Sequence, residues 1–90
     1  MIEPKTPLEE LIIEICNEVA DTLIQKNRDY GNSFSESREN FKNKYNNEKI
    51  PFIFHATEKI KRYEKCGSLD SILDIAGYSV LELVCARVDL

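Results

Sequence analysis

Hydrophobic residues recur at intervals of three and four along the first third of the chain, which is the spacing of one helix face. The apolar positions on this face are Leu8, Leu11, Ile12, Ile15, Val19 and Leu23. Thr6 is a suitable N-cap, Pro7 suits the first helical turn, and Glu9 completes a capping box with Thr6. We therefore predict a helix that begins at Pro7 and ends between Lys26 and Asp29.

Two further helices follow in the middle of the chain. Residues 34–45 carry four large side chains at helical spacing, namely Phe34, Arg38, Phe41 and Tyr45. The polar residues 43–49 are typical of a loop. Pro51 then opens a helix that is predicted to run to about Lys65.

The last helix is the most apolar segment of the chain. Gly67 predicts a helix stop and Ser68 a cap, so we predict a helix from Leu69 to about Arg87. Hydrophobic residues cover most of its circumference, which is typical of a helix buried on several sides. A 90-residue chain has hardly enough protein to surround it. We predict an all-α fold, a small bundle of about four helices in a single domain over residues 1–90, completed by homo-oligomerisation.

Composition narrows the class of protein. Hydrophobic residues make up 42% and charged residues 31% of the chain, which are globular values. The net charge of −4 argues against a binder of long nucleic acids, which needs concentrated Lys and Arg. Three cysteines and one histidine argue against a zinc site and favour a reducing, cytoplasmic setting. Cys16 and Cys85 lie in apolar contexts and are expected in the core. We expect no signal peptide and no membrane span.

A dense polar cluster interrupts the first helical pattern at residues 26–33. An ordinary helix end explains Gly31, which suits a positive φ, and Asn27 as a turn former. It does not explain the other members together, so we expect part of the cluster to contact a ligand. The candidate ligand-binding residues here are Lys26, Asn27, Asp29, Tyr30 and Ser33. Lys26 suits phosphates, and Tyr30 or Phe34 suits stacking on a base.

Asp70, Asp74 and Tyr78 follow one another at intervals of four, so they form a stripe along the last helix. Asp74 lies between two apolar residues and needs a cation, hydrogen-bond donors or a cavity. Mg²⁺ is one candidate partner, because it binds one or two carboxylates together with phosphate oxygens. An ion pair with Lys59 or Arg62, three residues apart on the preceding helix, is the structural alternative.

Glu14 and Glu18 form a similar pair on the first helix, and Asp21 follows. Two acidic helices that faced each other would form a magnesium site, with Glu18 joining Asp70 and Asp74. The alternative is that these residues form a solvated helix face. The lone His55 is more typical of a hydrogen-bonded structural residue than of a catalyst.

Three blocks of residues, taken in order, resemble the nucleotide modification associated domain family of phages and prophages. The blocks are Lys26-Asn27-x-Asp29-Tyr30-Gly31-x-Ser33-Phe34, then Lys59-x-x-Arg62, then Asp70-x-x-x-Asp74-x-Ala76-x-Tyr78. The members are small all-helical proteins that look like distant relatives of MazG-like and dimeric dUTPase-like nucleotide pyrophosphohydrolases. The resemblance covers roughly residues 10–86 and implies an oligomeric helical bundle that binds or acts on nucleotides.

The chain departs from this pattern at several positions. His55 and Glu58 stand where the family usually has Arg and Asp, and Cys66 stands where an acidic residue is frequent. The Glu-x-x-Glu and Glu-x-x-Asp pairs with which MazG-like enzymes bind magnesium are missing at the expected places. The chain offers instead two pairs at wider spacing, Glu14 with Glu18 and Asp70 with Asp74.

Three hypotheses follow from the sequence. The first is a nucleotide-binding protein that is a Mg²⁺-dependent pyrophosphohydrolase, with Asp70, Asp74 and Glu18 as metal ligands and Lys26, Lys59 and Arg62 on the phosphates. The second is a non-catalytic binder that sequesters a nucleotide second messenger in counter-defence. The third is a structural or regulatory partner protein. In this third case Asp74 pairs with a cation of the preceding helix, and the cluster around Tyr30 is only a brace.

Overall fold

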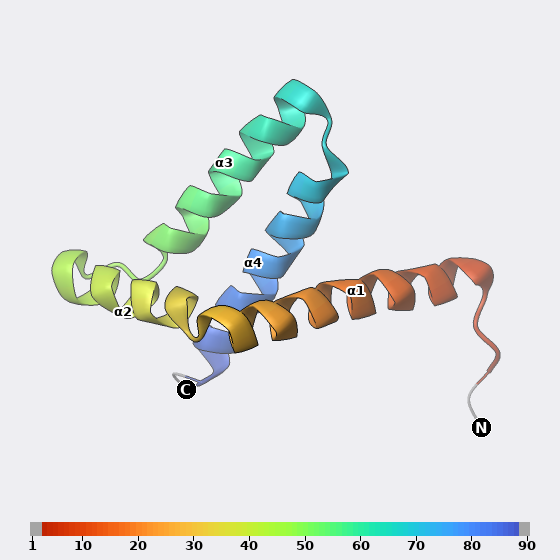
Figure 1. Ribbon diagram of the computed structural model, residues 1–90, viewed down its shortest axis with the longest axis horizontal. Helices are drawn as coiled ribbons and strands as arrows, with labels where there is room; N and C mark the ends of the chain where they lie inside the picture. Colours follow the sequence, from red (N-terminus) through yellow and green to blue (C-terminus); the bar gives the residue numbers. More distant parts are fainter. Residues whose placement is uncertain (1–2, 89–90) are drawn as a thin grey trace.

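Four helices joined by short turns make up the part of the chain that the structure, a computed structural model, describes, residues 3–88 (Figure 1). Helix α1 spans Pro7–Tyr30, α2 spans Ser33–Tyr45, α3 spans Ile50–Cys66 and α4 spans Leu69–Val88. No strand occurs between residues 3 and 88. The predicted all-α fold of about four helices is confirmed.

Local capping signals set both ends of α1. The Thr6 hydroxyl accepts a hydrogen bond from the backbone N–H of Glu9 (3.1 Å), and the Glu9 carboxylate accepts one from the Thr6 N–H (2.8 Å). The predicted capping box is therefore confirmed. At the other end the helix continues to Tyr30, slightly beyond the predicted limit of Asp29. It stops there because Gly31 has φ 70° and ψ −152°, which only glycine adopts readily.

The two helices in the middle of the chain have nearly the predicted bounds. Helix α2 ends at Tyr45, as predicted, where Asn46 adopts a left-handed conformation (φ 54°), and only residues 46–49 of the polar stretch 43–49 lie outside the helices. The Asn47 side chain then accepts a hydrogen bond from the Lys49 N–H (3.1 Å), which shapes the turn before α3. Gly67, with φ 66°, ends α3 as predicted.

Helices α3 and α4 form an antiparallel hairpin, against which the other two helices pack (Figure 1). Helix α2 lies on α3, and α1 crosses α4. At this crossing α4 carries Gly77, which is buried, and a Cβ placed there would lie 3.3 Å from Cδ2 of Leu23. The missing side chain thus allows α1 and α4 to approach closely.

The chain is open for its size. Its radius of gyration is 15.5 Å, whereas a compact domain of this length has about 12 Å. Between residues 3 and 88, no hydrophobic residue other than Pro51 is buried. The expectation that Cys16 lies in a core is wrong for the single chain, because Cys16 is exposed; Cys85 is half-buried. Helix α4 lies against α3 and α1, yet several of its apolar side chains remain exposed.

Candidate functional site

Tyr78 of α4 is the point where aromatic side chains from three helices meet. Its ring stacks on the His55 ring of α3, with centroids 4.6 Å apart and the planes 3° from parallel. Its ring also contacts Phe34 in the first turn of α2, at 5.9 Å between centroids. Phe34 belongs to the first sequence block and Tyr78 to the third. The fold therefore brings together blocks that are far apart in the chain.

Asp74 lies one helical turn before Tyr78 and forms an ion pair. Its Oδ2 atom is 3.1 Å from Nζ of Lys59 on α3. The Asp74 side chain is 34% exposed and that of Lys59 is 19% exposed. The ion pair with Lys59 is one of the partners proposed for Asp74 from the sequence, and it is present. Ion pairs with this exposure contribute about 1 kcal/mol or less. A phosphate can therefore compete with Asp74 for the ammonium group of Lys59, and a metal ion can compete with Lys59 for the carboxylate of Asp74.

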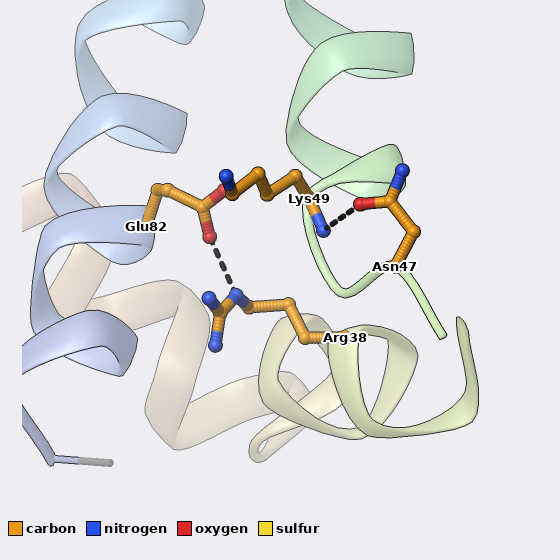
Figure 2. Close-up of polar contacts among 4 residues, drawn as sticks. All are labelled: Arg38, Asn47, Lys49 and Glu82. Atoms are coloured by element: carbon orange, nitrogen blue, oxygen red, sulfur yellow. Dashed lines mark hydrogen bonds and ion pairs between the residues drawn. The ribbon is translucent and has the colours of Figure 1, made fainter. Parts of the chain in front are cut away.

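Glu82 continues the same stripe one turn beyond Tyr78 and pairs with Arg38 of α2 (Figure 2). The Arg38 Nε atom donates to Glu82 Oε1 at 2.5 Å, and Arg38 is only 7% exposed. Beside this pair lies a groove lined by charged side chains and by Phe52, Ile53 and Ala86. The stripe along α4 thus has a polar or aromatic residue at every turn. Its last three members, Asp74, Tyr78 and Glu82, each contact a side chain of a neighbouring helix.

Sequence reasoning missed the pair of Arg38 with Glu82. Two signals were available. Glu82 lies four residues after Tyr78, so it extends the recognised stripe, and Arg38 shares a helix face with Phe34 and Phe41. Because the aromatic face of a helix becomes buried, a cation on that face needs a charged or hydrogen-bonding partner. Sequence reasoning also missed the stacking of His55 on Tyr78, which gives this lone histidine a packing role.

The polar cluster at residues 26–33 lies mainly at the end of α1 rather than in a loop. Lys26, Asn27 and Ser33 are exposed. Asp29 is exposed as well, and its carboxylate accepts a hydrogen bond from the Gln25 side chain (3.0 Å), one turn earlier in the same helix. Tyr30 is 75% exposed. The candidate side chains of the cluster are therefore accessible in the single chain.

The remaining candidates are spread over the surface. Arg62 and Asp70 are exposed on α3 and α4. Glu18 is exposed on α1, where it lines a shallow, polar depression with other α1 residues, including Glu14 and Asp21. Among the described residues of the single chain, no three His, Cys, Asp or Glu side chains are grouped so that they could hold a metal ion. Glu18 therefore does not join Asp70 and Asp74 within one chain.

Comparisons of the chain with protein-family models, with curated proteins and with solved structures found no match. In the described part of the chain, no helix combines the length and hydrophobicity required to cross a membrane.

Proposed function

We propose that the protein binds a nucleotide or a nucleotide-like phosphorylated molecule beside the stripe of α4. The observation that carries the proposal is the meeting of Phe34, His55 and Tyr78, with Lys59 one turn away from His55. This meeting supports the interpretation of the three sequence blocks as parts of one site. The resemblance to the nucleotide modification associated domain family, and with it a phage or prophage origin, is part of the same proposal.

Each group of such a ligand has a candidate partner among the exposed residues of the three sequence blocks. Lys59, Lys26 and Arg62 are the cations for the phosphates, because ammonium and guanidinium groups donate charge-assisted hydrogen bonds to them. Tyr30, with three quarters of its surface exposed, suits stacking on a base. Asn27, Asp29 and Ser33 would orient the base or sugar, and Tyr78 would form the floor of the site.

Binding without hydrolysis is the form of this function that the geometry supports best. Asp74 holds Lys59 in place through a weak, partly exposed ion pair, so an incoming phosphate can take over the ammonium group without unpairing a buried charge. Such a protein would sequester its nucleotide, for example a second messenger used in host defence. No metal is needed for this activity.

Hydrolysis would require Mg²⁺, and the residues fit that ion only in part. Asp70 and Asp74, one turn apart, provide the one or two carboxylates that Mg²⁺ takes alongside phosphate oxygens. Glu18 would have to come from elsewhere, because it is not grouped with them in the single chain. A bound Mg²⁺ would polarise the phosphoanhydride as in MazG-like hydrolases. We propose a homo-oligomeric, cytoplasmic protein in either case.

A purely structural or regulatory role is the second candidate function. The pairing of Asp74 with Lys59 favours it, because it satisfies the carboxylate without any ligand. In this case Asp74→Asn and Tyr30→Phe would change stability and no ligand affinity. The exposure of Tyr30 argues against this role, because a brace between helices would be covered.

A thermal-shift panel tests the proposed function. The protein is melted with nucleoside triphosphates, nucleoside diphosphates and cyclic nucleotides, each with Mg²⁺ and with EDTA. A ligand at about 100 times its Kd stabilises the native state by about 2.7 kcal/mol, which is roughly 10–20 °C for a small domain. Stabilisation that persists in EDTA supports the binder, and stabilisation that requires Mg²⁺ supports the hydrolase.

Two matched variants of α3 test whether Lys59 belongs to the binding site. Lys59→Gln removes a proposed phosphate ligand and is expected to weaken affinity about tenfold or more, because a hydrogen bond to a charged group contributes about 1.5–3 kcal/mol. Lys61→Gln, two positions along the same helix, is the control and should bind as the wild type does. No shift with any nucleotide, or equal losses in both variants, would contradict the proposal.

A further inference from the structure

Most of α1 extends away from the rest of the chain (Figure 1). From Pro7 to Glu18 every residue is exposed, and only Val19 and Leu23 are partly covered. The apolar side chains on the uncovered stretch expose about half of their surface or more: Leu8 67%, Leu11 50%, Ile12 53% and Ile15 45%. Soluble proteins seldom leave a continuous apolar face of this kind in water.

The uncovered face continues the face with which α1 packs on α4. Leu23 contacts the Gly77 position of α4, and Val19, Ile15, Ile12 and Leu8 follow along the same side of the helix. Their spacing of four, three and four residues is that of a seam between two long helices. The acidic residues of α1 lie on the other side: Glu10, Glu14, Glu18 and Asp21. The seam is free of charge and can therefore pack against an identical seam.

The exposed area of the whole chain exceeds that of a compact monomer by about as much as a stable dimer buries. The chain exposes 7471 Å², whereas a compact monomer of its mass exposes about 5,400 Å². The excess is about 2,000 Å² per chain, and obligate homodimers bury roughly 1,000–2,500 Å² per partner. The monomer also lacks a buried hydrophobic core among its described residues. A second copy exposes the same additional surface, so association of two chains would bury apolar surface of both and give each the core that it lacks alone.

We propose that a second copy of this chain covers the α1 seam, defined as Leu8, Ile12, Ile15 and Val19, and that two such seams pack together in a two-fold dimer. A two-fold interface uses the same surface on both partners, which an uncharged apolar seam permits. The proposal names the surface through which the homo-oligomer forms. It is independent of nucleotide binding, because its test measures mass and not affinity.

Sedimentation velocity over a concentration series tests the proposal. The wild type is expected at twice the chain mass of 10.4 kDa. Ile12→Glu places a charge in the seam and should give monomers. Ile13→Glu is the matched control, since Ile13 is the adjacent residue, is similarly exposed and points away from the seam. This variant should sediment as the wild type does.

Circular dichroism of each sample shows whether the helices are retained. If Ile12→Glu unfolds, the milder Ile15→Ala decides the matter, with an expected rise of about tenfold or more in the dimer dissociation constant, the usual scale for a truncated interface anchor. A monomeric wild type would overturn the proposal. So would a dimer that is unaffected by the seam substitutions, or one that Ile13→Glu breaks as effectively as Ile12→Glu.

Discussion

Glu82→Gln is the substitution from which we expect the largest effect on stability outside the proposed dimer seam. The glutamine keeps the size of the side chain and one acceptor oxygen but removes the negative charge opposite Arg38. Arg38 is 93% buried, given its exposure of 7%. Its guanidinium would then lose the charged partner on α4, and breaking a buried ion pair by removing one member costs about 3–5 kcal/mol in a fully enclosed site.

The observed geometry places the expected cost at or below the lower limit of this range. The Glu82 side chain is 20% exposed, so water reaches part of the site and lowers the penalty. We expect a loss of about 2–3 kcal/mol in the free energy of unfolding. For a chain of this length, whose total stability is on the order of 5–13 kcal/mol, this is a large fraction.

Urea denaturation followed by circular dichroism measures the loss, with all variants at one protein concentration so that association contributes equally. Asp74→Asn is the control, because its pair with Lys59 is more exposed and should contribute about 1 kcal/mol or less. The double variant Arg38→Met with Glu82→Leu should cost less than the sum of its single substitutions. If Glu82→Gln cost no more than Asp74→Asn, the argument from burial would be wrong.

Two glycine predictions follow from the backbone. Gly31→Asn is expected to lower the free energy of unfolding by about 1–3 kcal/mol, because φ 70° with ψ −152° suits glycine alone. Gly67→Asn should cost clearly less in the same urea titration, because Gly67 has a left-handed conformation that Asn tolerates. At the helix crossing, Gly77→Ala should change stability by less than about 1 kcal/mol, because better helix propensity offsets a tight contact with the flexible Leu23 side chain. Gly77→Leu should push α1 from α4 and cost about 1–3 kcal/mol, and equal stability of the two Gly77 variants would refute the close approach.

The sequence predicted the helices well because their ends depend on local chemistry. Thr6, Pro7 and Glu9 determine the start of α1, and Gly67 ends α3, without help from distant residues. Residues 43–45 belonged both to the predicted helix 34–45 and to a polar stretch predicted as a loop, and the structure places them in α2. Composition alone could not decide there, because Lys and Asn occur in exposed helices as well as in loops.

The site was predictable in part. The stripe of Asp74 and Tyr78 was recognised from its spacing, and Lys59 was one of two cations proposed for Asp74. Nothing in a single sequence states which helix faces another, so the contacts of Tyr78 with Phe34 and His55 required the structure. Likewise, the pattern of α1 shows that one face must be covered but not what covers it.

Amide shifts in ¹H–¹⁵N spectra, recorded while the nucleotides of the thermal-shift panel are added in turn, test the central claim most directly. We expect saturable shifts at residues 26–34 and around Lys59, Asp74 and Tyr78, with α1 residues 7–18 unaffected. Lys59→Gln should weaken these shifts and Lys61→Gln should not. Shifts confined to other surfaces, or none with any nucleotide, would contradict the assignment of this surface as a nucleotide site.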